Sequence, residues 1–315
     1  MLLTNRQFFY ISRYMKTPTF IPFFIFTFVF GLTHTFAQTW TNIWSLDLSQ
    51  LSPGDIVSTE NTNIDYVTPL ETTKNVVYKA IENNGKIGIT TQRYGDDSSQ
   101  LYKSSTLSKD LGLEFYTKLG GYEYGKTVLK ISGDLTTVNR DGGSDTWFGM
   151  SFRQKGSTYD ILTDSAPLMR FTYKHVAIHS GLGSANSNFV DGIPNTVSTG
   201  NNLTFEITLD TTKQSTNPDE WFWYEVTVNS TDTGEQLYTR QGYMMAPTDT
   251  SLLDNFWAET FNFGNYLYYA DNAPTQEGTT LYALSVDAYN IPEPSAYAAI
   301  LGLICLPALL LRRRK

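Results

Sequence analysis

Residues 203–209 read Leu-Thr-Phe-Glu-Ile-Thr-Leu, so apolar and polar side chains alternate along the whole stretch. The same period of two recurs in residues 221–228, 282–288 and 129–135. Strict alternation is typical of a β-strand that buries one face and exposes the other, whereas an amphipathic helix repeats every ~3.6 residues. About a dozen such runs, separated by Gly, Asn, Asp and Ser, lie between residues 38 and 290, and no amphipathic helix interrupts them. We therefore expect an all-β fold in one domain, an antiparallel β-sandwich or jelly roll.

The N-terminal residues 1–37 depart from this pattern. Arg13 and Lys16 precede an apolar stretch over residues 20–32, and Thr35-Phe36-Ala37 offers small residues where a signal peptidase cuts. This order predicts a cleaved secretory signal peptide over residues 1–37. The alternative is an uncleaved N-terminal anchor, which the shortness of the apolar stretch disfavours.

The C-terminal residues 291–315 form a second distinct segment. A Pro-Glu-Pro box precedes an uncharged run over residues 295–311 and a basic cluster: Pro292, Glu293 and Pro294, then Arg312, Arg313, Arg314 and Lys315. The run would make a helix of about 25 Å, close to the ~30 Å hydrocarbon core of a bilayer. The basic cluster should remain cytoplasmic. We predict a single C-terminal transmembrane helix.

The order of box, apolar helix and basic cluster resembles the PEP-CTERM sorting tail. The resemblance implies that exosortase and the export machinery are partners of the chain. It also implies transient residence in the inner membrane of a Gram-negative-type bacterium, followed by the cell surface or extracellular matrix. The alternative is a plain C-terminal membrane anchor without processing.

The domain between these segments, residues 38–290, is acidic. The leader carries three and the tail four of the 23 basic residues, and the tail carries one of the 31 acidic residues, which leaves 16 basic against 30 acidic residues, a net charge near −14. Such a charge argues against nucleic-acid binding. The one cysteine, Cys305, lies in the tail, so the domain has to be stable without a disulfide.

The last third of the domain carries a second resemblance. Residues 261–268 read Phe-Asn-Phe-Gly-Asn-Tyr-Leu-Tyr, and residues 280–286, after a polar loop, read Thr-Leu-Tyr-Ala-Leu-Ser-Val. They resemble the closing strands of alginate-lyase-type polysaccharide lyases, Y-F-K-A-G-x-Y-x-Q and roughly F-Y-x-L-x-V. The resemblance implies a concanavalin A-like jelly roll.

The lyase family removes the proton beside a uronic acid carboxylate, with residues from the motifs R-S-E-L-R, Q-I-H and Y-F-K-A-G-x-Y. Only Tyr266 matches these groups, because Asn262 stands in place of the Lys and Tyr268 in place of the Gln. The segment Ser151-Phe152-Arg153 stands for Q-I-H, and residues 104–108 stand for R-S-E-L-R with every charge gone. The resemblance therefore implies the fold and argues against the reaction. If the chain is a lyase, Tyr266 is its acid or base and Arg153 neutralises the carboxylate.

The family's strand order also predicts where a site would lie. Alternation puts Tyr266 and Tyr268 on one face of their strand, and Ser151 and Arg153 on one face of theirs. We expect both pairs in one groove with Asn262 at its end, and Arg153 and Tyr266 within reach of one sugar unit.

Two further sets of residues are candidates for ligand binding. By alternation Trp221 and Trp223 share a face, which is a platform for stacking on sugar rings if open and ordinary core if covered. Arg170 and Lys174 share a basic row that would suit an anionic polysaccharide, the alternative being a solvated sheet face.

No cofactor is expected. Asp141 and Asp145 flank a Gly-Gly-Ser turn and are weak candidates for calcium, a tight turn being the simpler explanation. The sequence thus predicts an exported surface or matrix protein that is non-catalytic and binds polysaccharide. The alternatives are a divergent uronate lyase and a structural coat protein without a ligand.

Overall fold

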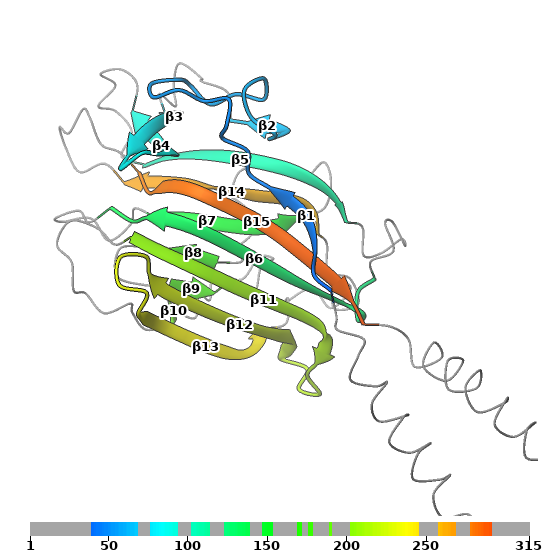
Figure 1. The fold of residues 1–315 in the computed structure, drawn as a ribbon. Helices are drawn as coiled ribbons and strands as arrows, with labels where there is room; N and C mark the ends of the chain where they lie inside the picture. Colours follow the sequence, from blue (N-terminus) through cyan, green and yellow to red (C-terminus); the bar gives the residue numbers. More distant parts are fainter. Residues whose placement is uncertain are drawn as a thin grey trace, which may run out of the picture. The chain divides into compact units, whose positions relative to one another are not determined.

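A computed structural model describes residues 39–68, 76–93, 102–113, 123–138, 147–153, 169–171, 176–178, 189–190, 202–245, 258–268 and 278–291. They form a β-sandwich within the compact unit Trp40–Ile291 (Figure 1). The leader and the tail lie outside the described residues, so the signal peptide, the Pro-Glu-Pro box and the transmembrane helix stay predictions. Across the described ranges, no helix has the length and apolar character needed to cross a bilayer.

The expected all-β antiparallel sandwich is confirmed. Sheet A has eight strands in the order β13-β12-β11-β6-β15-β4-β3, with β1 added beside β15. Its strands are β1 (Thr41–Ser45), β3 (Val76–Asn83), β4 (Lys86–Arg93), β6 (Thr127–Thr136), β11 (Asn202–Gln214), β12 (Glu220–Ser230), β13 (Gln236–Met245) and β15 (Thr280–Asn290).

Sheet B has seven strands in the order β10-β9-β8-β7-β14-β5-β2. Its strands are β2 (Tyr66–Val67), β5 (Tyr102–Leu113), β7 (Trp147–Arg153), β8 (Met169–Phe171), β9 (Val176–Ile178), β10 (Phe189–Val190) and β14 (Ala258–Tyr268). Neighbouring strands in this sheet come from distant parts of the sequence, since β14 lies between β5 and β7.

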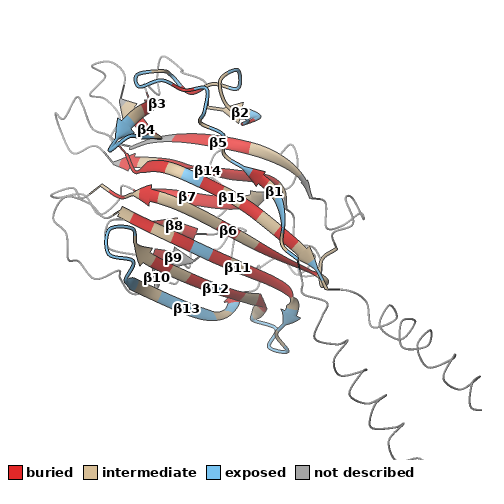
Figure 2. Ribbon diagram, in the orientation of Figure 1, coloured by how far each residue is buried: buried red, intermediate tan, exposed pale blue. Residues whose placement is uncertain are grey.

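The alternation read from the sequence matches the burial of β11. Leu203, Phe205 and Ile207 are buried, whereas Glu206 between them is exposed (Figure 2). The start of β12 breaks the rule, because Trp221 and Phe222 are both buried and the pairing with β13 is irregular between Glu220 and Trp223. A strand's period of two holds only where its register is regular.

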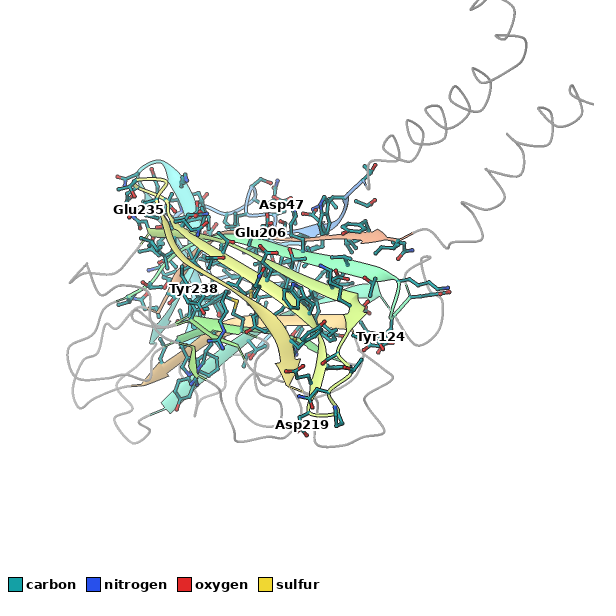
Figure 3. All side chains as sticks on the ribbon, turned by 90° about the horizontal axis from the view of Figure 1, so that it is seen from below. Asp47, Tyr124, Glu206, Asp219, Glu235 and Tyr238 are labelled. Atoms are coloured by element: carbon teal, nitrogen blue, oxygen red, sulfur yellow. The ribbon has the colours of Figure 1, made fainter. Side chains whose placement is uncertain are left out.

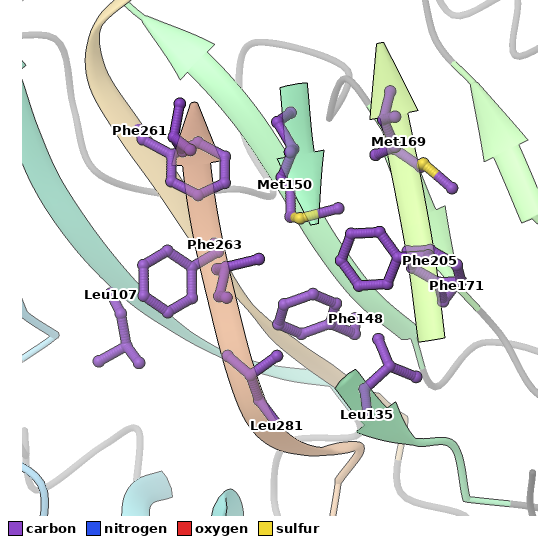
Figure 4. Packing of buried hydrophobic residues seen from close by; sticks show 14 of the residues in the cluster. Leu107, Leu135, Phe148, Met150, Met169, Phe171, Phe205, Phe261, Phe263 and Leu281 are labelled. Atoms are coloured by element: carbon purple, nitrogen blue, oxygen red, sulfur yellow. The ribbon is translucent and has the colours of Figure 1, made fainter. Parts of the chain in front are cut away.

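The core fills the space between the sheets (Figure 4). Sheet B contributes Phe148, Met150, Phe261 and Phe263, and sheet A contributes Leu135, Phe205 and Leu281, all of them at most 3% exposed. Burying each such side chain contributes roughly 1.5–3 kcal/mol. The core therefore fixes which residues of β7 and β14 face inward, and by alternation which face outward.

Candidate functional site

Strands β5, β14 and β7 place three polar residues directly side by side. Asn262 of β14 pairs with Ser108 of β5 on one side and with Ser151 of β7 on the other. Phe261 and Phe263, the neighbours of Asn262 in sequence, belong to the core cluster. Asn262 and its two partners therefore lie on the opposite, outer face of sheet B, because successive side chains alternate across a strand.

These three residues, which we call the polar row, are buried without hydrogen-bond partners. Ser108 is 1%, Asn262 0% and Ser151 3% exposed. Both hydroxyl oxygens and both amide atoms of the row, Oδ1 and Nδ2 of Asn262, have no partner among the described residues. Buried polar groups are hydrogen-bonded in the great majority of cases, and each one left unpaired costs about 1–3 kcal/mol. The polar row therefore lowers the stability of the unliganded protein.

Two glycines follow the polar row along the face. Gly264 of β14 pairs with Gly149 of β7, and Arg170 of β8 pairs with Gly149 in turn. The two glycines add no side chains at this register level, which Thr106 of β5 and Arg170 of β8 flank. Both glycines are buried.

An aromatic pair lies on the far side of the two glycines from the polar row. Tyr266 of β14 is paired with Trp147 of β7, and their rings stack with centroids 5.2 Å apart and planes at 22°. The guanidinium carbon of Arg170 lies 5.8 Å from the centroid of the Trp147 ring, a cation–π contact. Tyr266 and Arg170 are half-buried, whereas the polar row is closed to solvent. Trp147 is buried at 7% exposed, so Tyr266 and Arg170 are the residues at this end of the face that solvent reaches in part.

This arrangement suits recognition better than acid–base chemistry. The polar row offers two hydroxyls and one amide, none of which ionises near neutral pH. Tyr266 is four positions along β14 from Asn262, about 13 Å away, far outside the reach of a proton transfer within one complex. Among the described residues no cluster of His, Cys, Asp and Glu is arranged to hold a metal ion.

The structure separates two residues that the sequence placed at one sugar unit. Arg153 is paired with Thr260, whereas Tyr266 is paired with Trp147, six positions earlier on β7. Six residues of a strand span about 20 Å, so the backbones of Arg153 and Tyr266 are about that far apart along the strands. The register thus places the two backbone positions too far apart along the strands for a single sugar unit, and the shared groove stays a prediction. The side chain of Arg153 lies outside what the structure describes.

The two tryptophans of β12 do not form a platform. Trp221 is 6% exposed and part of the core cluster, where its ring lies 4.7 Å from that of Phe222. The expectation that Trp221 shares a face with Trp223 is wrong, because the irregular start of β12 turns Trp221 inward. Trp223 is half-buried on the outer face of sheet A, where its ring meets Tyr243 edge-on at 5.1 Å.

Other candidates cannot be placed. The side chain of Tyr268 and the whole of Lys174, Asp141 and Asp145 lie outside the described residues, as do the sorting residues from Pro292 onward. Neither Trp147 nor Gly149 was expected as a site residue, and Ser108 was considered only as part of the segment that stands for R-S-E-L-R. The signal for β7 was present, because residues 147–153 read Trp-Phe-Gly-Met-Ser-Phe-Arg and alternate Phe and Met with small, polar or amphipathic residues.

Comparisons with known proteins yield only distant structural likenesses. No protein-family model matches the chain, and no curated protein matches it either. The CBM2 module of the evolved Dit of Lactobacillus casei BL23 phage J-1 is similar at a TM-score of 0.43 and 10% identity, covering 81% of this chain and 98% of its own. Peanut lectin has a TM-score of 0.38 and 11% identity, covering 72% of this chain and 98% of its own. Winged bean acidic lectin has a TM-score of 0.39 and 11% identity, covering 70% of this chain and 95% of its own. With TM-scores this low, we base the function on the site's own geometry.

Proposed function

We propose that the protein is an exported, non-catalytic carbohydrate-binding protein of the concanavalin A-like jelly-roll kind, whose site is the outer face of sheet B. The observation that carries the proposal is the polar row, with four buried side-chain polar atoms and no partner among the described residues. A ligand that supplies those hydrogen bonds gains the free energy that the unliganded protein forgoes.

A sugar supplies the hydrogen-bond donors and acceptors that the polar row needs. Its hydroxyl groups both donate and accept, as the Ser108 and Ser151 hydroxyls and the two ends of the Asn262 amide require. Its apolar ring face stacks on aromatic side chains, and the Trp147–Tyr266 pair lies one step beyond the glycines. The Arg170 guanidinium beside Trp147 favours a glycan that carries acidic groups.

A lyase needs a base, an acid and a group that neutralises the uronate carboxylate around one sugar. The positions that flank Asn262 are both serines, and Tyr266 stands apart from them. We therefore assign binding without turnover and keep the divergent lyase as the outcome that an activity assay would reveal.

The proposal includes export by the leader and sorting by the tail. A precursor chain ending before Pro292 should be exported without being retained at the inner membrane, while the sandwich itself stays folded. Fractionation of cells that express the full and the shortened chain measures this. Equal distribution of both chains would contradict a sorting role for the tail.

Binding is tested by retention on a panel of neutral and uronic-acid polymers. Ser151→Ala should raise the dissociation constant about five- to twelvefold, since each hydrogen bond to the ligand contributes roughly 1–1.5 kcal/mol, and Asn262→Leu, which removes two polar atoms, should raise it further. Thr227→Val is the matched control, because this threonine is half-buried on the outer face of sheet A.

Three results separate the functions. Retention that both site variants weaken and the control preserves supports the proposal. Unsaturated products absorbing in the ultraviolet would identify a lyase instead. No retention on any polymer would leave a structural coat protein.

A further inference from the structure

The first and last strands of the sandwich are paired, so both chain ends leave it at one place. Thr41 of β1 pairs with Ala288 of β15. One residue outward, the Trp40 and Tyr289 rings meet edge-on with centroids 4.4 Å apart. We call this place the exit end. Figure 3 shows the two ends of sheet A, with Tyr124 and Asp219 at one end and Glu235 at the other. The backbone N–H of Ile291, the last described residue, donates to the Lys126 carbonyl at 2.7 Å.

Aromatic side chains cross the outer face of sheet A at the exit end. One register level joins Tyr243 to Trp223, Trp223 to Asp210, Asp210 to Val128 and Val128 to Tyr289. We call Trp40, Tyr289, Val128, Trp223 and Tyr243 the aromatic strip. Trp223 and Tyr289 are three strands apart, about 14 Å at the spacing of strands. The strip therefore runs across the sheet rather than along a strand.

The strip combines half-exposed rings with lysines. Tyr243 is 36% exposed, and Trp40, Trp223 and Tyr289 are half-buried, whereas Val128 between them is 1% exposed. The Lys130 Nζ lies 4.7 Å from the Trp40 ring centroid, and the Lys213 Nζ lies 5.7 Å from that of Trp223. Each ammonium also pairs with a carboxylate, Lys130 with Glu206 at 3.7 Å and Lys213 with Asp210 at 3.2 Å. The strip is thus amphipathic and carries no excess of positive charge.

The burial of the aromatic strip affects the hydroxyl of Tyr289. Burial raises the pKa of the Tyr289 hydroxyl, and the nearby Asp210 carboxylate raises it further. Asp210 belongs to β11, two strands from β15 in sheet A, and shares the register level of Tyr289 through Val128 of β6.

The short segment between the exit end and the uncharged run limits the distance between the strip and a bilayer. Only residues 292–294 separate Ile291 from the uncharged run that begins at Ser295. Three extended residues span at most roughly 10 Å, and the headgroup layer of one leaflet is roughly 5–8 Å thick. Tyr289 therefore lies within about 20 Å of the hydrocarbon edge whenever the run spans the membrane.

We propose that the aromatic strip is a membrane-contacting surface, which lies against the lipid headgroups while the tail tethers the chain. The inference rests on the proposed tail, which supplies the tether. Trp and Tyr favour the membrane interface because their rings are apolar and their N–H or O–H is polar. Lysines beside them extend their ammonium groups into water while their stems cover the rings. Because both lysines are paired with carboxylates, aromatic contact and not net charge holds the surface to the lipid.

The test uses the full chain reconstituted in phosphatidylcholine vesicles whose lipids carry a bromine quencher just below the headgroup. Tryptophan emission should be quenched, and the double variant Trp40→Phe, Trp223→Phe should lose most of the quenchable part. Trp147→Phe is the control, because Trp147 lies in sheet B at the site described above. Raising the salt concentration should leave the quenching unchanged.

Each contrary result has its own meaning. Insertion of the tail without quenching of Trp40 and Trp223 would overturn the inference and leave the tether standing. Quenching that salt abolishes would also overturn it, since charge would then hold the surface. Failure of the chain to enter the vesicles at all would overturn the tether and the inference together. Tyr243→Ser gives a second variant that leaves both indoles in place and should weaken the quenching in part.

Discussion

At the scale of single residues, buried polar side chains fall into two kinds. Tyr78 of β3 bridges the two sheets: its hydroxyl donates to the Ser105 carbonyl at 3.2 Å and accepts from the Asn265 N–H at 2.7 Å. The polar row has no such partners among the described residues. The first kind stabilises the fold, and the second kind lowers its stability in a way that a ligand would reverse.

Asn262→Leu should therefore raise the stability of the unliganded protein, or leave it unchanged, while it weakens binding. The substitution removes two unpaired polar atoms and keeps a side chain of similar length in a closed site, a gain of up to about 1–3 kcal/mol. Urea denaturation of variant and wild type measures the change in the free energy of unfolding. A large loss of stability would show that the amide is already satisfied.

Tyr78 should make stability fall at high pH. Burial raises the pKa of its hydroxyl above the ordinary value of 10.0, while the Asn265 N–H acts in the opposite direction. Above pH 10 the unfolded chain releases this proton and the folded chain keeps it, so the free energy of unfolding falls by up to about 1.4 kcal/mol per pH unit. Below pH 10 the contribution is complete.

Denaturant titrations at pH 8 to 11 on wild type and Tyr78→Phe measure this slope. The variant should be less stable by about 1–3 kcal/mol at pH 8, because the Asn265 N–H loses its acceptor. Its free energy of unfolding should fall less steeply above pH 10 than that of the wild type. Parallel slopes in the two proteins would assign the effect to the other tyrosines.

At the scale of the elements, the close pairing of β6 with β11 depends on a residue without a side chain. Gly133 of β6 pairs with Phe205 of β11, and a methyl group there would lie 2.4 Å from the Phe205 Cζ. The Phe205 ring crosses the core to Phe171 of β8, with centroids 4.8 Å apart. The glycine therefore makes room for a ring that joins the two sheets.

Gly133→Ala should destabilise the sandwich by about 1–3 kcal/mol, since the Phe205 ring has to leave its packed position. Gly242→Ala in β13 is the control: its nearest neighbour would be 3.7 Å away, and its effect should stay within about 0.5 kcal/mol. Thermal unfolding followed by circular dichroism compares the two. Equal effects would mean that the ring moves aside freely.

At the scale of the whole molecule, the chain closes on itself. The first strand, β1, lies against the last, β15, and β15 is interior to sheet A, beside β6 on one side and β4 and β1 on the other. Residues 39 and 291 therefore end close together, although the domain between them is long. Termini that meet in this way tolerate being joined.

A circular permutant with residues 39 and 291 linked by a short Gly-Ser segment should fold. The new ends belong between Asn84 and Gly85, the exposed turn that joins β3 and β4, where both residues have positive φ. Circular dichroism should match that of the parent domain. A permutant opened inside β11 should not fold, and success there would refute the role of β11 in the sheet.

Much of the fold follows from local pattern. Alternation in residues 203–209 predicted both the strand and its inward face, because side chains of a strand always alternate. The closing segments around Tyr266 and Leu284 were expected as strands and are β14 and β15. The prediction failed at Trp221, where a shift in pairing, which alternation alone does not encode, brings two successive residues into the core.

The sequence by itself determined that the domain is an antiparallel sandwich and which residues face the core wherever the strand pairing is regular, because a regular strand alternates apolar and polar side chains. Only the tertiary structure decided the polar row and the aromatic strip. Their members come from β5, β7 and β14 in one case and from four strands of sheet A and the residue before β1 in the other. Which distant strands pair, and in which register, depends on the packing of the whole chain, and a shift of one residue would turn every side chain to the other face.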